Sequence, residues 1–203
     1  MDIDFKSVPK HYAARTHEKM KEVLMDPLGV GPAIHYYMIR GGKEQRNITV
    51  WEAGTISYEY IKTYGHYHVG ALDENYWIIH GEGIALLQKL VVNEKGQMIA
   101  DRVEEFKAIP VKTGDKVYMP SGYGHLLVNT GRTYFVTADD SPVSFEDKVD
   151  EASMPGHADY ELVKIMQGFS YYVVENNGKP ALKKNLKYKE IKSQDLGGLP
   201  IIE

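Results

Sequence analysis

The sequence predicts an all-β protein, a sandwich or barrel of short strands with one helix near its N-terminus. From residue 34 onward, short runs rich in β-branched and aromatic residues recur at close spacing, separated by glycines and polar clusters. The chain contains 15 tyrosines, many of them inside these runs, and tyrosine is enriched in strands. Many short strands with helix only near the ends are typical of a sandwich or barrel.

The predicted helix covers residues 10–26, where Tyr12, Met20 and Leu24 recur at roughly helical spacing and Pro27 follows as a stop. The predicted strands cover residues 34–40, 48–54, 56–62, 76–80, 84–92, 103–109, 117–119, 125–128, 134–137 and 169–175. Residues 93–96, with the sequence Asn-Glu-Lys-Gly, predict a hairpin turn, and residues 176–178 predict another. Residues 139–159 predict a long loop with a short helix around 145–152, and about the last twenty residues carry no clear pattern.

The composition restricts the classes of function. The chain of 203 residues is 43% hydrophobic, which is enough for a core, and we expect a single domain over residues 1–203. The net charge of −4 argues against a nucleic-acid binder, because no basic surplus exists to neutralise phosphates. The absence of cysteine excludes disulfides, thiolate ligands and thiol nucleophiles. No signal-peptide core or membrane-spanning run is present, so we expect a cytoplasmic protein without a membrane partner.

Histidines at strand spacing carry most of the functional information. His66 and His68 are separated by one residue, and alternate residues of a strand point to the same face, so both imidazoles can reach one ion. Glu74 follows soon after, with Asp73 as its nearest alternative, and His125 lies far downstream. Three imidazoles and a carboxylate suit one divalent transition metal ion, Fe, Mn, Ni, Co or Zn, with positions left for a substrate. The remaining histidines that we interpret as surface or core residues are His11, His17, His35 and His80.

Two motifs resemble those of the cupin superfamily, a family of small β-barrels. The motif G-x5-P-x-G-x2-H-x3-N is matched by Gly114, Pro120, Gly122, His125 and Asn129. The motif H-x-H followed by E-x6-G is matched by His66, His68, Glu74 and Gly81. Five residues separate His68 from Glu74, where the family usually has three or four, so Glu74 matches the motif less closely than the histidines do. The resemblance implies a single cupin double-stranded β-helix, a jelly-roll barrel, with its core over about residues 34–178.

A longer stretch is similar to the cupin-type glucose-6-phosphate isomerases, which are known chiefly from archaea. The similarity covers most of residues 34–180. The matching segments are Thr49, Thr63–His68, Glu74-x-Tyr76, Gly81-x-Gly83, Val117–Pro120, His125, Gly156-His157, Gly168–Ser170 and Val174–Gly178. The family has a tyrosine just ahead of its Gly-His pair; this chain has none there, and Tyr160 is the candidate replacement.

The resemblance implies a metal-dependent aldose–ketose isomerase of glycolysis and gluconeogenesis, which interconverts glucose 6-phosphate and fructose 6-phosphate through a metal-stabilised enediol. It implies that the metal ligands are His66, His68, Glu74 and His125. It implies that the substrate phosphate is bound by Thr49, Thr63 and the backbone at Gly65. The residues implied to be catalytic are Glu74, Tyr76 and His157, with Glu74 as the leading candidate for the base. A hydride shift is the rival route, and it needs no base.

Two other functions fit the same ligands. An Fe(II) dioxygenase acting on a small organic acid or thiol uses a similar set, but Thr49, Thr63 and His157 would then have no reason to converge. A non-catalytic sugar-phosphate-binding cupin is the third hypothesis, because one fold hosts many functions. We also expect a homodimer, since cupin barrels often pair through exposed sheet edges.

Overall fold

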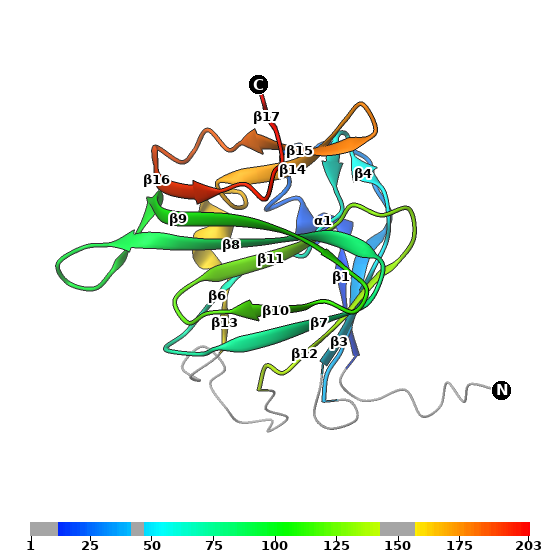
Figure 1. The fold of residues 1–203 in the computed structure, drawn as a ribbon, viewed down its shortest axis with the longest axis horizontal. Coiled ribbons are helices and arrows are strands. Elements are labelled where there is room, and N and C mark those ends of the chain that lie inside the picture. Colours follow the sequence, from blue (N-terminus) through cyan, green and yellow to red (C-terminus); the bar gives the residue numbers. More distant parts are fainter. Residues whose placement is uncertain (1–11, 42–46, 143–156) are drawn as a thin grey trace.

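The structure is a computed structural model, and it describes residues 12–41, 47–142 and 157–203 (Figure 1). Strands dominate this part of the chain, as the sequence predicts. The elements in order are β1 (Tyr12–Thr16), α1 (His17–Met20), β2 (Ile34–Ile39), β3 (Asn47–Trp51), β4 (Thr55–Ile56), β5 (Glu59–Tyr60), β6 (Tyr67–His68), β7 (Glu74–His80), β8 (Glu82–Val92), β9 (Met98–Lys112), β10 (Lys116–Met119), β11 (Gly124–Asn129), β12 (Phe135–Asp139), β13 (Ala158–Asp159), α2 (Glu161–Ile165), β14 (Tyr171–Asn176), β15 (Lys179–Lys184), β16 (Glu190–Asp195) and β17 (Ile201–Ile202).

Two main sheets form the walls of the barrel. A six-stranded sheet has the order β1-β2-β3-β12-β7-β10, and a four-stranded sheet has the order β11-β8-β9-β16. A five-stranded sheet, β17-β15-β14-β5-β4, lies at the top of the view in Figure 1, and the short β13-β6 pair lies toward the lower left. The all-β jelly-roll barrel predicted from the sequence is confirmed.

Strand alternation places the core between the sheets. Along β3, Asn47, Thr49 and Trp51 are buried, while the residues between them are partly exposed. Trp51 packs edge-to-face on Phe135, with ring centroids 4.8 Å apart, and both side chains have no exposed surface. Full burial of a phenylalanine side chain contributes roughly 1.5–3 kcal/mol. The inward positions that do not hold such large apolar groups are therefore the ones that can shape a site.

The predicted N-terminal helix over residues 10–26 is wrong. Within the described residues, 12–16 form β1, which pairs antiparallel with β2 from Tyr12 opposite Ile39 onward. Only His17–Met20 are helical, with Thr16 as the N-cap whose hydroxyl accepts a bond from the Lys19 backbone N–H. The edge of β2 supplies a full set of backbone partners, and this tertiary pairing overrides a weak helical pattern.

The other sequence predictions fall close to the observed strands. The hairpin turn at 93–96 is confirmed, since the Asn93 N–H bonds the carbonyl of Gln97 and Gly96 has a φ of 75°. The predicted strand over 56–62 is interrupted at Ser57, where φ is 55°, so it yields the short β4 and β5. The helix predicted around 145–152 lies outside the described residues. The single domain over residues 1–203 stays a prediction.

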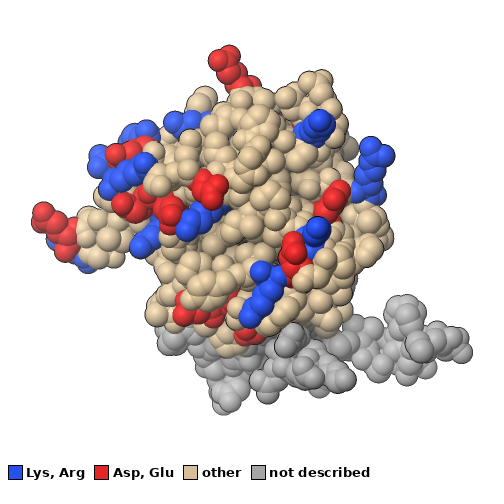
Figure 2. Space-filling model, viewed as in Figure 1, with Lys and Arg blue, Asp and Glu red and all other residues tan. Residues whose placement is uncertain are grey.

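The outer surface carries mixed charge. On the face shown in Figure 2, lysines and acidic residues are interspersed rather than gathered by sign. Where β16 runs parallel to β9, Lys192 bonds Glu104 at 2.8 Å and Lys189 bonds Asp101 at 2.5 Å. That face therefore lacks the basic patch that nucleic-acid binding needs. Among the described residues, no helix is both long enough and apolar enough to cross a bilayer.

Candidate metal centre

The two distant histidine segments meet through backbone pairing. The His66 N–H donates to the His125 carbonyl at 3.2 Å, and the His125 N–H donates to the His66 carbonyl at 3.0 Å. Residues paired in this way carry their side chains on one face of the sheet, so both imidazoles point into the barrel. Gly65 permits this approach, because its φ is 82° and a Cβ there would lie 3.2 Å from the side chain of Leu126.

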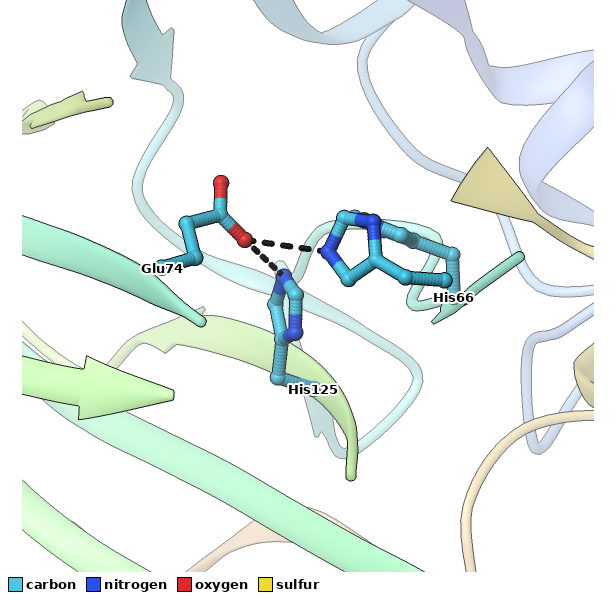
Figure 3. Close-up of side chains that lie close together, drawn as sticks. His66, Glu74 and His125 are labelled. Atoms are coloured by element: carbon cyan, nitrogen blue, oxygen red, sulfur yellow. Dashed lines mark hydrogen bonds and ion pairs between the residues drawn. The ribbon is translucent and has the colours of Figure 1, made fainter. Parts of the chain in front are cut away.

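Glu74 reaches the histidines from the opposite sheet. It opens β7, paired with Met119 of β10, while His125 lies on β11 (Figure 3). Its Oε2 lies 3.1 Å from His68 Nε2 and 3.2 Å from His125 Nε2. One oxygen of Glu74 is thus shared between two imidazoles that come from different segments.

The four predicted ligands form one cluster, in which Glu74 and His125 are buried and His66 and His68 are partly buried. One donor atom from each of His66, His68, Glu74 and His125 can be chosen so that all four lie within 4.8 Å of one another. The exposed fractions of the His68, Glu74 and His125 side chains are 7%, 1% and 2%. Donor atoms bound at right angles, about 2.1 Å from one ion, lie about 3 Å apart. The contacts of Glu74 Oε2 therefore match the spacing of a coordination sphere.

The protonation states also suit a cation. Burial would raise the pKa of Glu74, but the bonds from His125 and His68 outweigh it and hold this pKa below its usual range. Burial and the nearby His125 and His68 hold the pKa of His66 well below its usual value. An ionised carboxylate and a neutral imidazole are the forms that bind metal. The donor set therefore fits a divalent transition metal.

A pocket adjoins the cluster. Its lining residues are Tyr36, Met38, Arg40, Thr49, Trp51, Thr63, Gly65, His66, Tyr76, His125 and Tyr160. The three residues predicted to bind phosphate, Thr49, Thr63 and Gly65, thus share one pocket with two of the predicted metal ligands. The Tyr76 hydroxyl lies 3.4 Å from His125 Nε2. Burial, then the charges of Glu74 and Asp139, hold the pKa of Tyr76 well above its usual value, so its hydroxyl keeps its proton.

The structure does not bring His157 to this pocket. The Val69 N–H bonds the His157 carbonyl at 2.8 Å, and Ala158 pairs with His68 across β13 and β6. Alternation from Ala158 then turns Tyr160, not His157, to the side of the metal cluster. The Tyr160 ring lies 5.6 Å from the His66 ring, between centroids, and Tyr160 lines the pocket.

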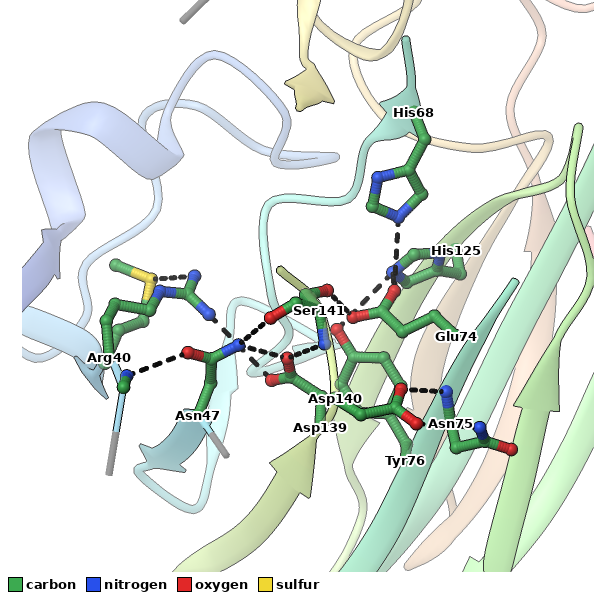
Figure 4. A network of polar contacts seen from close by, with 12 residues as sticks. Arg40, Asn47, His68, Glu74, Asn75, Tyr76, His125, Asp139, Asp140 and Ser141 are labelled. Carbon is green, nitrogen blue, oxygen red and sulfur yellow. Dashed lines mark hydrogen bonds and ion pairs between the residues drawn. The ribbon is translucent and has the colours of Figure 1, made fainter. Parts of the chain in front are cut away.

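A polar network lies behind Glu74, and the sequence patterns did not predict it (Figure 4). Asn47 Nδ2 donates to Asp139 Oδ1 at 2.6 Å, Arg40 lies 3.9 Å from Asp139 Oδ2, and the Ser141 hydroxyl bonds Glu74 Oε1. Burial, followed by the charge of Glu74, raises the pKa of Asp139. The sequence signal that could have revealed this network is a polar residue at an inward position, since Arg40 continues the alternation of Tyr36 and Met38.

The asparagine of the second motif has a structural role. The Asn129 side-chain amide donates to the carbonyls of Glu52 and Thr133, both at 2.9 Å, and its oxygen accepts from the Gly131 N–H. Asn129 is fully buried and closes the turn that follows β11. It therefore fastens the strand that carries His125 without lying in the metal cluster.

Comparison with known proteins yields a family. The model of the family described as Glucose-6-phosphate isomerase (GPI) matches residues 36–190. Glucose-6-phosphate isomerase of Thermococcus onnurineus is 32% identical over 142 residues, which cover 70% of this chain and 62% of that protein. The enzyme of the same name from Thermococcus litoralis is 33% identical over 144 residues, covering 70% of this chain and 62% of that protein. The chain thus spans less than two thirds of the length of these curated relatives.

One solved structure illustrates a distant likeness in fold. Oxalate decarboxylase of Lactobacillus farciminis, in a formate complex, has a TM-score of 0.35 and 14% identity over 51% of this chain and 27% of that one. A likeness of this size supports no inference. The family match covers most of the chain, including the metal cluster and every residue of the pocket lining. On that ground, the chain belongs to the glucose-6-phosphate isomerase family.

Proposed function

We propose that this chain interconverts glucose 6-phosphate and fructose 6-phosphate with the help of a bound divalent transition metal. The observation that carries the proposal is one pocket lined both by metal-cluster histidines and by the predicted phosphate residues. The relatives from Thermococcus onnurineus and Thermococcus litoralis are glucose-6-phosphate isomerases by name, which supports the same activity.

The residues that would hold the ion are His66, His68, Glu74 and His125. A bound ion would act as a Lewis acid toward the oxygens of the sugar at the reacting carbons. Fe, Mn, Ni, Co and Zn all accept three imidazoles and a carboxylate, so the ion is proposed only as one of these five.

The phosphate would lie against Thr49, Thr63 and the backbone at Gly65. Thr63 Oγ1 already accepts the Leu127 N–H at 3.1 Å, so its own hydroxyl proton is left to donate to a phosphate oxygen. Arg40 adds a positive charge to the same pocket, where a dianion must leave water. The lining therefore supplies both hydrogen bonds and charge for a phosphate.

Tyr76 and Glu74, which lie at the cluster, would handle different protons of the substrate. Tyr76 keeps its proton and would donate to a substrate oxygen rather than act as a base. Glu74 would move the proton between C1 and C2, but both of its oxygens are engaged, one with Ser141 and one with the imidazoles. It must release one oxygen to act as a base. A role for His157 stays a prediction.

A coupled isomerase assay on chelated protein, with each of the five ions added back in turn, tests the proposal. We expect activity on glucose 6-phosphate with at least one ion and loss of it on chelation. Inactivity with all five ions, or oxygen consumption by the Fe(II) form instead, would overturn it. In deuterated water, label at C1 or C2 of the product indicates proton transfer, whereas its complete absence indicates a hydride shift.

We further propose that the chain forms a homodimer. The six-stranded sheet ends in β1 and β10, and edge strands offer unpaired backbone groups. Tyr12 on β1 and Tyr118 on β10 are also 47% and 54% exposed, which favours contact with another apolar surface. Gel filtration at micromolar concentration tests this, and a monomer there would contradict it.

A further inference from the structure

The two oxygens of Glu74 have different partners. Oε2 faces the Nε2 atoms of His68 and His125, at 3.1 and 3.2 Å. Oε1 accepts a hydrogen bond from the Ser141 hydroxyl (Figure 4). A carboxylate can bind an ion through one oxygen or through both. The Ser141 bond favours the one-oxygen arrangement, because Oε1 would have to leave it in order to reach the ion.

Ser141 is itself fixed on both sides of its backbone. Its N–H donates to Asp139 Oδ1 at 3.2 Å, and its carbonyl accepts from Asn47 Nδ2 at 3.1 Å. The same Asn47 amide donates to Asp139 Oδ1 at 2.6 Å, and the two residues are paired across β3 and β12. The position of the Ser141 hydroxyl is therefore set by the register of two strands of the barrel wall.

Burying the side chains of Asn47 and Asp139 costs free energy. The exposed fractions of Asn47 and Asp139 are 0% and 1%, and within the described part of the chain Asp139 has one cationic partner, Arg40, with a long 3.9 Å contact. A buried carboxylate with such weak compensation costs more than an apolar side chain of similar size. What Asp139 supplies in return is the acceptor that fixes Asn47 and Ser141. The burial of Asp139 is thus explained by its role in fixing Ser141, whose hydroxyl holds Glu74.

We propose that Ser141, fixed by Asn47 and Asp139, is a positioning residue that holds Glu74 as a one-oxygen ligand with Oε2 turned toward the metal. Groups behind the ligands of a metal orient those ligands and tune affinity for the ion. Holding Oε1 away from the ion leaves more of its coordination positions open for substrate oxygens. The inference rests on the proposed function only in requiring a metal at the cluster.

The test compares Mn²⁺ binding by the apo forms of wild type, Ser141→Ala and Ser57→Ala. Ser57→Ala is the matched control, because the Ser57 hydroxyl also donates to a carboxylate, Asp26 Oδ2 at 2.6 Å, on an exposed loop. We expect Ser141→Ala to bind Mn²⁺ about 10–100-fold more weakly. We also expect its bound-Mn²⁺ EPR spectrum to change, since the carboxylate is free to bind through both oxygens. Ser57→Ala should match wild type in both measurements.

Two further variants separate positioning from folding. Ser141→Thr keeps the hydroxyl and should restore both affinity and spectrum. Asn47→Leu removes the amide donor that holds the Ser141 carbonyl and adds no charge beside Asp139, so it should weaken Mn²⁺ binding while the hydroxyl itself remains. If Ser141→Ala does not fold, Asn47→Leu and Ser141→Thr carry the test alone, with wild-type affinity in Asn47→Leu or unrestored affinity in Ser141→Thr counting against the proposal.

These measurements distinguish a failure of the positioning proposal from a failure of the proposed isomerase function. Wild-type affinity and an unchanged spectrum in Ser141→Ala overturn the positioning role, even if the wild-type enzyme isomerises glucose 6-phosphate. A wild-type protein that binds Mn²⁺ but is inactive refutes the proposed function and leaves the positioning role to be decided by the variants. A wild-type protein that binds no Mn²⁺ overturns the positioning role as well.

Discussion

A pair of imidazoles, the buried His35 and the partly buried His17, should make the fold sensitive to acid. His17 Nε2 lies 3.0 Å from the Gly29 carbonyl, which can only accept, so this nitrogen carries a proton. In neutral His17, Nδ1 then accepts a hydrogen bond from the Nε2–H of His35, at 2.8 Å. His35 Nδ1 is left buried without a partner among the described residues. A second proton on His35 would meet no acceptor in the described part of the chain.

The size of the effect follows from the pKa of His35. Burial, then the charges of His17 and Lys62, lowers this pKa from 6.5 to about 4. As the pH falls below 6.5, the unfolded chain takes up a proton that the folded chain refuses, so stability is lost as the pH falls toward 4. The full shift corresponds to about 3 kcal/mol, of which about 2 kcal/mol should be lost between pH 7.5 and pH 5.

Urea denaturation of wild type and His35→Met at these two pH values measures the effect. The variant will have lower absolute stability, but its free energy of unfolding should fall by about 2 kcal/mol less than that of wild type. Titrating groups that do not contact His35 contribute to both proteins and cancel in the difference. His80→Asn, at an exposed position, should behave as wild type. Equal losses in wild type and His35→Met would refute the reasoning.

Three further changes test the site and the fold. His125→Ala should abolish isomerase activity and also bound metal, measured by elemental analysis, whereas His80→Ala should keep both. Retained metal in His125→Ala would contradict the assignment of His125 as a metal ligand. Lys62→Met leaves the buried Glu59 carboxylate without its lysine partner at 2.6 Å. The free energy of unfolding, measured by urea denaturation, should fall by about 3–5 kcal/mol. A double variant that also carries Glu59→Leu should recover much of this loss. Thr49→Val removes a hydroxyl without changing size and should raise the KM for glucose 6-phosphate about tenfold, so an unchanged KM would remove Thr49 from the phosphate site.

Local pattern was enough to predict most strands, since alternation and turn residues act over a few positions. β3 shows this directly, with its buried side chains at every second residue. The helix over 10–26 failed for the opposite reason. Residues 12–16 form a strand only because the edge of β2 is beside them, and a single segment carries no record of its neighbour.

The sequence by itself determined that two imidazoles two residues apart can share a face, and the motif around His125 indicated the third. The tertiary structure decided that the His66 and His125 backbones pair, that Tyr160 rather than His157 faces the pocket, and that Asn47, Asp139 and Ser141 meet behind Glu74. The physical reason is that periodicity along a strand sets which side each residue faces. Which residues then meet depends on the register between strands, and hydrogen bonds between segments far apart in the chain set that register.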